Sequence, residues 1–276
     1  KFRFGWVLWR YRLSLLRGRQ VKRKYPMASN LFQMQNGAKS FGEKHLFVDA
    51  SFAVNEGEHI AIIGPNGAGK STLFKILIGQ EHLDSGEITR ANGLRVGYLA
   101  QEDNWNIQDL AVDYLNKNSI LPVWELKQLG LDLGLTEQMF SQPLSTLSGG
   151  FRMRFKLLAL IGQKPDLMLL DEPTNFLDLE SLVVLENFLQ DYANAFLLIS
   201  HDREFLRRTT EYTLEIENGS LTKFSGNIDD YFEQKAMLQQ IIEQKAANNE
   251  NKRKQIEAFV ERFRAKATKA KQAQSR

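Results

Sequence analysis

Short apolar runs that end abruptly in polar or glycine-rich segments recur along the chain after residue 27. His59–Ile63, Leu167–Leu170 and Ala195–Ile199 are three such runs. A run of four or five apolar residues bounded by turn signals predicts a strand that is buried on both faces of a parallel sheet. The segment Lys70–Ile78, which follows the first run, has the pattern of a helix. The chain is therefore predicted to be α/β, with alternating strands and helices.

The last fifty residues have a different pattern. Residues 227–276 contain no proline or glycine, and their composition favours helix throughout. We predict about 36 residues of continuous helix, which would be about 54 Å long. Two apolar stripes at helical spacing lie on it. Their residues are Met237, Leu238, Ile241 and Ile242, then Ile256, Phe259, Val260 and Phe263.

Charge is distributed unevenly, although the whole chain has 36 Lys and Arg against 33 Asp and Glu. Residues 1–26 hold nine basic residues and no acidic one, and Met27 is the first candidate start. We expect residues 1–26 to be foreign to the fold, with a targeting presequence as the alternative. Residues 252–276 hold nine basic residues against two Glu. Any basic surface for a partner is therefore expected to be local.

Missing residue types exclude several kinds of chemistry. The chain has no cysteine, which excludes disulfides, thiolate zinc sites and cysteine nucleophiles and fits a reducing compartment. Its four histidines are far apart in sequence, so we do not expect a metal site built from histidine. The sequence has no run of about 18 apolar residues, so no transmembrane helix is predicted.

A glycine-rich segment that ends in Lys70-Ser71 lies between a predicted strand and a predicted helix. It fits GxxxxGK[ST], in which bare backbone N–H groups encircle phosphate oxygens at the positive end of the helix. Lys70 is expected to neutralise the β- and γ-phosphates and the Ser71 hydroxyl to bind Mg²⁺. An incidental glycine turn is the alternative. The expected nucleotide-binding residues here are Gly64, Asn66, Gly67, Ala68, Gly69, Lys70, Ser71 and Thr72.

The other two apolar runs also end in chemically active residues. Asp171 and Glu172 follow one run, and adjacent carboxylates repel each other unless something favours their charge. We expect Asp171 to bind the metal and Glu172 to act as the catalytic base on a water molecule. A solvated acidic turn is the alternative. His201 follows the last run, and taken alone such a histidine is more often structural than catalytic.

Six motifs in order resemble the complete series of an ATP-binding cassette (ABC) ATPase. The resemblance covers about residues 29–226 and implies a P-loop NTPase cassette with a mixed sheet core, an antiparallel β subdomain and a small helical subdomain. It also implies ATP hydrolysis with ATP and Mg²⁺ as cofactors. The motifs are Gly64–Thr72, Gln101 after Val96–Ala100, Leu147–Gly150, Asp171–Asn175, Leu177–Asp178 and His201.

The same resemblance implies roles for residues outside the phosphate loop. Phe41 takes the place of the aromatic residue that stacks on adenine. Gln101 would sense Mg²⁺ and the attacking water, and His201 would contact the γ-phosphate as a catalytic residue. The segment Ser148, Gly149 and Gly150 would bind the nucleotide of an opposite cassette. This chain contains one cassette, so alone it is expected to bind ATP but hydrolyse it poorly.

Details of the motifs indicate the subfamily. Phe151-Arg-Met-Arg after the LSGG segment resembles the ABC-F subfamily of soluble, translation-associated ATPases, which implies a cytoplasmic protein. Phe176 departs from this pattern, because histidine is expected there. The interval of residues 102–147 leaves little room for a long helical arm, and Trp105 and Trp124 within it are expected to be packing residues.

Three regions are therefore expected: a foreign or targeting-like extension at 1–26, an ABC ATPase domain at 27–226 and a basic helical linker at 227–276. The last resembles the ABC-F interdomain linker, which joins two cassettes and reaches toward tRNA on the ribosome, and its cations would contact RNA phosphates. A solvated helix or half of a coiled coil is the alternative. Two other functions stay open: the ATPase subunit of a transporter, and a truncated nucleotide-binding fragment without turnover.

Overall fold

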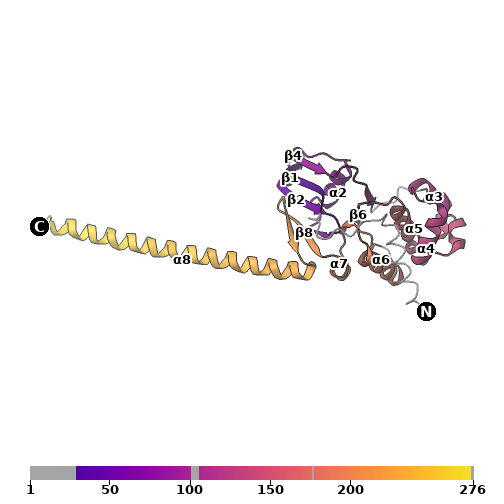
Figure 1. The fold of residues 1–276 in the computed structure, drawn as a ribbon. Coiled ribbons are helices and arrows are strands. Elements are labelled where there is room, and N and C mark those ends of the chain that lie inside the picture. The colour runs from indigo at the N-terminus through magenta and orange to yellow at the C-terminus, as the bar shows by residue number, and fades with distance from the viewer. Residues whose placement is uncertain (1–28, 101–105, 176, 275–276) are drawn as a thin grey trace. The chain divides into compact units, whose positions relative to one another are not determined.

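The computed structural model describes residues 29–100, 106–175 and 177–274. The described chain forms two compact units, the first ending at Ile228 and the second beginning at Asp229. Figure 1 shows that the first unit is a mixture of strands and helices and that the second is helical. Each unit is described separately below.

A three-stranded antiparallel sheet comes first along the chain. Its order is β2-β1-β4, and β1 and β2 form a hairpin in which Phe41 pairs with Lys44. Alternate apolar residues on these strands are buried, among them Phe32 and Phe52, because one face of the sheet packs on the core. The strands are β1 (Asn30–Phe41), β2 (Lys44–Asn55) and β4 (Ser85–Arg90).

A six-stranded sheet forms the centre of the first unit. Its order is β5-β6-β7-β3-β8-β9, and all neighbours are parallel except β8 and β9. Every residue of β6 and β7 is buried, which explains why both were continuous apolar runs. The strands are β3 (His59–Ile63), β5 (Val96–Leu99), β6 (Leu167–Asp171), β7 (Ala195–Ile199), β8 (Tyr212–Glu217) and β9 (Ser220–Ser225). The predicted α/β class with a mixed sheet and an antiparallel subdomain is confirmed.

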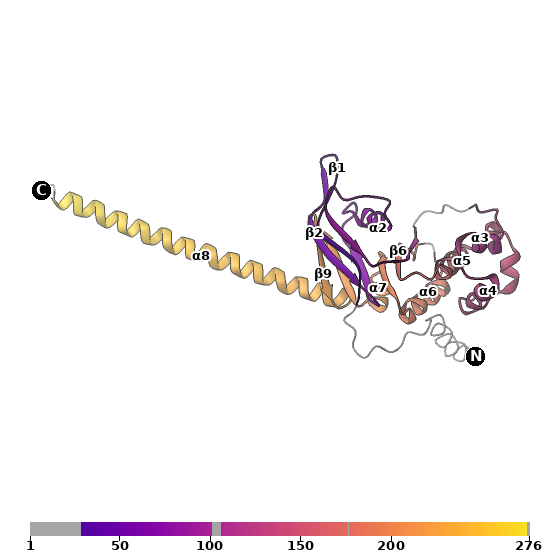
Figure 2. The same cartoon turned by 45° about the horizontal axis from the view of Figure 1, so that its top comes forward.

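Helices directly follow three of the parallel strands or make up a separate region. α3 and α4 pack against α5, as can be followed in Figure 2, and Phe140 meets Phe155 of α5 edge to face at 5.1 Å between ring centroids. Among the described residues, the helices of this unit are α2 (Lys70–Ile78), α3 (Ala111–Asn118), α4 (Val123–Asp132), α5 (Gly149–Gly162), α6 (Leu179–Asp191) and α7 (Arg203–Thr209). Two 3-10 turns, η1 (Glu137–Ser141) and η2 (Leu144–Thr146), complete it.

One expectation about this helical region is wrong. Trp124 on α4 is 64% exposed, and the buried side of that helix consists of Leu126, Leu129 and Gly130. Trp124 is therefore not a packing residue, because the helix turns it away from α5. Trp105 lies outside the described residues.

The second unit is a single helix, α8 (Ile228–Gln274), of 47 residues. At the usual rise per residue, this helix is about 70 Å long, which exceeds the predicted length. The reason is that the helix begins before the first apolar stripe and continues beyond the second. Met237, Leu238, Ile241 and Ile242 are exposed on it. The side chains of Phe259, Val260 and Phe263 lie outside the described part of the structure.

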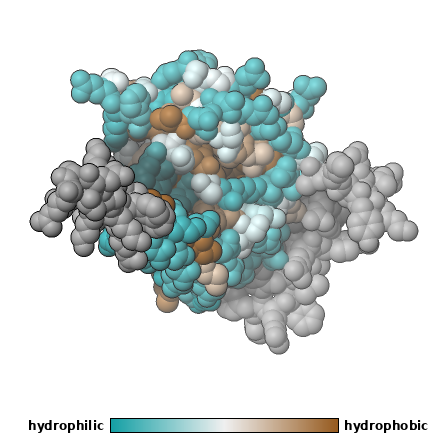
Figure 3. Space-filling model, turned by 90° about the vertical axis from the view of Figure 1, so that its left-hand side faces the viewer, coloured by the Kyte–Doolittle hydropathy of each residue, from teal (hydrophilic) through white to brown (hydrophobic). Residues whose placement is uncertain are grey.

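One face of the described residues is mainly polar (Figure 3). Hydrophilic side chains cover most of the face drawn in Figure 3, and apolar ones are scattered among them. Within the described ranges, no helix is both long and apolar enough to cross a membrane.

Candidate nucleotide-binding site

The loop from Gly64 to Gly69 connects the carboxyl end of β3 to the first turn of α2. Gly64 has φ 154° and Gly69 has φ 105°, both in the region that favours glycine. A Cβ atom on Gly64 would lie 2.5 Å from the backbone oxygen of Ile216 on β8, so a larger residue does not fit. The Leu73 N–H donates to the Gly69 carbonyl at 2.8 Å and begins the helix. The loop thus brings backbone N–H groups to a helix N-terminus, an arrangement that suits phosphate.

Lys70 begins α2 and folds back over this loop. Its Nζ donates to the carbonyl oxygens of Gly64 at 2.8 Å and Pro65 at 3.2 Å. Burial lowers the pKa of Lys70, and the Glu172 and Asp171 carboxylates oppose this by favouring the charged amine. A cation is therefore held at the mouth of the loop with two acidic groups nearby.

Asp171 ends β6 beside the first turn of α2. Its carboxylate accepts hydrogen bonds from the Ser71 hydroxyl and, at 3.4 Å, from the Tyr98 hydroxyl of β5. Burial raises the pKa of Asp171, while these bonds and Lys70 act in the opposite direction. Tyr98 was not predicted as a site residue from the sequence. Its only sequence signal is that it alternates with residues that are buried in the strand Val96–Leu99. Burial raises the pKa of Tyr98 to about 12.

Ser71 and Asp171 suit a magnesium ion. Both offer oxygen, the donor that Mg²⁺ prefers, and the ion usually takes one or two carboxylates and completes its shell with phosphate oxygens and water. In the part of the chain that the structure describes, no three His, Asp or Glu side chains gather as a metal site. A Mg²⁺ ion held by Ser71 and Asp171 would thus depend on a bound phosphate group.

Glu172 and His201 are brought together across β6 and β7. The Glu172 carboxylate lies with Oε1 3.3 Å from His201 Nε2, and its Oε2 accepts the His201 backbone N–H at 3.3 Å. Glu172 has φ 51°, a conformation that costs a residue with a side chain about 1–2 kcal/mol. Its N–H donates to the Ile199 carbonyl at 2.9 Å, which holds it there. The carboxylate is buried, while the His201 side chain is 71% exposed.

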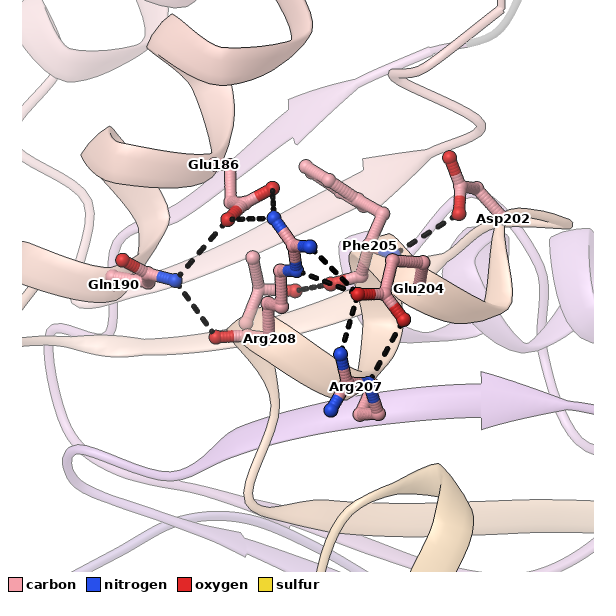
Figure 4. Close-up of polar contacts among 8 residues, drawn as sticks. Glu186, Gln190, Asp202, Glu204, Phe205, Arg207 and Arg208 are labelled. Carbon is pink, nitrogen blue, oxygen red and sulfur yellow. Dashed lines mark hydrogen bonds and ion pairs between the residues drawn. The ribbon is translucent and has the colours of Figure 1, made fainter.

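Helix α7 follows His201 and is anchored on α6, as Figure 4 shows. Asp202 caps α7 by accepting the Phe205 N–H at 3.0 Å, and the Phe205 side chain is buried. Arg208 pairs with Glu186 of α6 at 3.3 Å. An exposed pair contributes about 0–1 kcal/mol, so the cap and the buried ring do most to fix the residues after His201.

Phe41 lies at the tip of the hairpin between β1 and β2. Its ring is 50% exposed and is therefore available to a ligand. Its pairing partner Lys44 extends toward the phosphate loop, since a Cβ atom on Gly67 would lie 2.9 Å from Lys44 Nζ. The hairpin tip thus lies beside the loop, as a contact with the base of a bound nucleotide requires.

The segment Ser148–Gly150 forms the start of α5. Ser148 is the N-cap, and its Oγ accepts the Phe151 N–H at 3.4 Å. A Cβ atom on Gly150 would lie 2.2 Å from Ser181 Oγ, because the starts of α5 and α6 touch. Only glycine fits this close approach, and the N–H groups at the helix start form a second place suited to an anion.

Arg154 is a structural residue that was not predicted. It is 4% exposed, and its guanidinium donates to the Leu133 carbonyl at 3.2 Å and to Ser181 Oγ at 3.1 Å. It also lies over the Phe151 ring, 5.0 Å from the centroid. A signal was present, because Arg154 falls on the same face of α5 as the buried Leu158. Gln101, for which a role was expected, and Phe176, where histidine was expected, lie outside the described residues.

Comparison with known proteins identifies the class. Two family models, both described as ABC transporter, match residues 47–175 and 214–276. The fold, the phosphate loop and these matches define an ATP-binding cassette, and the chain belongs to the ABC transporter family. Within that family it is of the ABC-F type, as its curated relatives are.

Three relatives from two bacteria illustrate this. The ribosome protection protein VmlR of Bacillus subtilis is 38% identical over 192 residues, which are 69% of this chain and 35% of VmlR. The uncharacterized ABC transporter ATP-binding protein YfmR of the same organism is 31% identical over 88% of this chain and 45% of its own length. The probable ATP-binding protein YheS of Escherichia coli K12 is 30% identical over 85% of this chain and 42% of its own length. The chain thus spans less than half of each of these relatives.

Solved structures support the fold. The ATP-binding subunit of an ABC transporter superimposes with a TM-score of 0.64 at 24% identity over 75% of this chain and 93% of that one. A nucleotide-free ATP-binding cassette from an ABC transporter superimposes with a TM-score of 0.59 at 19% identity, over 72% of this chain and 92% of that one.

Proposed function

We propose that this chain binds ATP with Mg²⁺ and hydrolyses it as one half of a two-cassette ABC-F ATPase that acts on the ribosome. One observation carries the catalytic part. The carboxyl ends of β3, β6 and β7 bring Lys70, Asp171, Glu172 and His201 to one edge of the sheet. A phosphate loop, a metal-binding carboxylate and a buried carboxylate that contacts a histidine are what hydrolysis of a phosphoanhydride needs.

Each residue then has a role in the step. Lys70 neutralises the β- and γ-phosphates, and Ser71 and Asp171 would hold Mg²⁺, which would add positive charge beside the phosphates. Glu172 accepts a proton from water as the water oxygen bonds to the γ-phosphorus and the bond to the β-phosphate oxygen breaks, releasing ADP and phosphate. His201, fixed by its contact with Glu172 and exposed beside it, contacts the γ-phosphate.

A second cassette completes the site in this proposal. The start of α5 presents backbone donors, with Ser148 as cap and Gly150 packed on α6, and in an opposed pair of cassettes this segment faces the other nucleotide. The proposed assembly is therefore closed by ATP and opened by hydrolysis. The chain by itself is expected to bind ATP and to turn it over slowly.

The ribosomal role rests on two further observations. A relative at 38% identity is named a ribosome protection protein. Helix α8 is followed to Gln274, and the region of residues 252–276 holds nine basic residues against two Glu, which suits the phosphates of ribosomal RNA or tRNA. We accordingly propose that the protein works in the cytoplasm. The role of transporter subunit is the second candidate, favoured by the transporter cassettes that share its fold.

The first experiment separates binding from turnover. Glu172→Gln should leave ATP affinity within about twofold and reduce hydrolysis at least about 100-fold, because general-base catalysis contributes that much. ATP affinity is measured by titration and hydrolysis by phosphate release, with saturating Mg²⁺ and protein concentration varied. Glu137→Gln, an exposed residue of η1, is the matched control and should change neither. Unchanged turnover in Glu172→Gln would overturn the proposed catalysis.

The second experiment tests the ribosome. In a protein that carries both cassettes, Glu172→Gln with ATP should sediment with ribosomes, and the same protein with ADP should not. Retention should fall as salt is raised if RNA phosphates are contacted. Sedimentation that is equal with ATP and ADP would contradict nucleotide-gated binding, and co-purification with a membrane permease would favour the transporter role.

A further inference from the structure

A buried lysine lies against the exposed ring at the hairpin tip. Lys39 on β1 is 8% exposed, and its Nζ lies 4.9 Å from the centroid of the Phe41 ring. The same amine is 3.2 Å from Glu81 Oε2 and 3.7 Å from Asp84 Oδ1. The ring therefore has a cation over one face, and that cation is held by two carboxylates.

The acidic residues of this cluster come from the segment between α2 and β4. Asp84 Oδ2 accepts the Ser40 N–H at 2.6 Å, and the Asp84 N–H donates to the Ala38 carbonyl at 2.8 Å. Residues 81–84 thus hold the last residues of β1 through both backbone and side-chain bonds. Helix α2 begins at the phosphate loop and leads directly into residues 81–84. About a dozen residues therefore connect the phosphate loop to the segment that holds the hairpin tip.

The chemistry of the cluster explains why a lysine is used. A cation over an aromatic ring is attracted to the face of the ring, and the attraction is larger when the cation is removed from water, as Lys39 is. Because Lys39 occupies one face of the Phe41 ring, an incoming base can stack only on the other face. The ring is also held in place beforehand, so it does not have to be ordered at the moment of binding. The ion pairs with Glu81 and Asp84 hold the amine in place over the ring.

We propose that Lys39 is a positioning residue for the nucleotide base. Paired with Glu81 and Asp84, it holds the Phe41 ring so that its open face receives a purine beside the phosphate loop. This inference rests on the proposed binding of ATP and deepens it. Lys39 contacts neither phosphates nor reacting atoms in this arrangement and acts through Phe41.

The test compares a ligand that has a base with one that has none. In the full chain, Lys39→Met keeps the aliphatic stem and removes the cation. It should weaken ATP binding about fivefold, because the ring then has to be ordered when the base binds, and it should leave the affinity for inorganic tripolyphosphate unchanged. Phe41→Ala should weaken ATP about tenfold. The double variant should match Phe41→Ala alone, because both changes remove the same stacking.

Lys223 offers a matched control. Its Nζ lies 4.7 Å from the Tyr212 ring centroid and 2.6 Å from Glu58 Oε2, which precedes β3 at the end opposite to the phosphate loop. Lys223→Met removes the same kind of contact and should lower the denaturation midpoint without changing ATP affinity. Lys39→Arg, which keeps a cation over the ring, should restore ATP affinity to within twofold.

Three results would overturn the inference: unchanged ATP affinity in Lys39→Met, an equal loss for ATP and tripolyphosphate, or additive effects of Lys39→Met and Phe41→Ala. If Lys39→Met does not fold, Glu81→Gln with Asp84→Asn leaves the lysine and removes its partners, and the same comparison of ligands applies. A wild-type chain that binds neither ligand would instead refute the proposed nucleotide function.

Discussion

At the scale of single residues, the site depends on places where one residue type fits. Gly64 lies against the Ile216 backbone, and Gly150 lies against Ser181. Glu172 occupies a left-handed conformation despite its side chain, held by a backbone bond to Ile199. Such backbone strain is found where the surrounding structure compensates for it, and it is common at functional sites.

The close approach at Gly64 yields a prediction. Gly64→Ala should abolish measurable ATP binding and destabilise the fold by about 2 kcal/mol or more, because the new methyl group would meet the Ile216 oxygen at 2.5 Å. Gly93→Ala is the control, since Gly93 has φ 73° but nothing within 4 Å of a Cβ atom. It should cost about 1 kcal/mol and leave ATP binding intact. Urea unfolding and ATP titration of both variants measure this, and equal effects would contradict it.

At the scale of elements, α5 is tied to its neighbours by a buried cation. Arg154 bonds the Leu133 carbonyl after α4 and the Ser181 hydroxyl of α6. Its ion pair with Glu180 at 3.4 Å is the weaker contact, because Glu180 is largely exposed and solvent screens it. The start of α5 thus has its position set by two helices at once.

Replacement of this cation gives a second prediction. Arg154→Met should lower the free energy of unfolding by about 2–3 kcal/mol, since the Leu133 carbonyl and the Ser181 hydroxyl lose their donor. Urea denaturation measures the change. Arg152→Met, on the same helix and partly exposed, should cost less than about 0.5 kcal/mol. A loss of similar size in both variants would mean that the buried contacts of Arg154 do not matter.

At the scale of the whole molecule, the six-stranded sheet carries a buried titratable group. His59 begins β3 and stacks on Phe196 of β7, 4.3 Å between ring centroids. Its Nε2 is buried without a hydrogen-bond partner among the described residues. Burial lowers the pKa of His59 from its usual value of 6.5, and Glu211 raises it to a smaller extent.

This yields a prediction about pH. Below pH 6.5, His59 takes up a proton more readily in the unfolded chain than in the folded one. The contribution of His59 to the free energy of unfolding is therefore fully present above that pH and is lost as the pH drops below it. The loss from this group is at most about 1.4 kcal/mol per pH unit. His59→Phe should remove part of this decline. The measurement is urea unfolding at pH 7.5 and 5.5, with His82→Gln at an exposed site as control. An unchanged slope in His59→Phe would contradict it.

Much of the fold was predictable because the signals are local. The runs at β3, β6 and β7 are continuous and apolar, which a strand buried on both faces requires. The glycine loop before Lys70 lies within a few residues of both its strand and its helix. The long helix was predicted because proline and glycine are absent, although its length was underestimated. Trp124 was wrongly predicted as a packing residue because aromatic character alone does not say which side of a helix is covered.

The sequence by itself determined the elements, the phosphate loop and the family, since each depends on residues that are neighbours along the chain. The tertiary structure alone decided which strand ends meet. The order β6-β7-β3 brings Glu172 to His201, which lies 29 positions further along. In the other sheet, the pairing of β1 with β4 brings Lys39 to Glu81 and Asp84. Such contacts depend on how crossovers and core packing arrange distant segments, and periodicity within a segment carries no information about them.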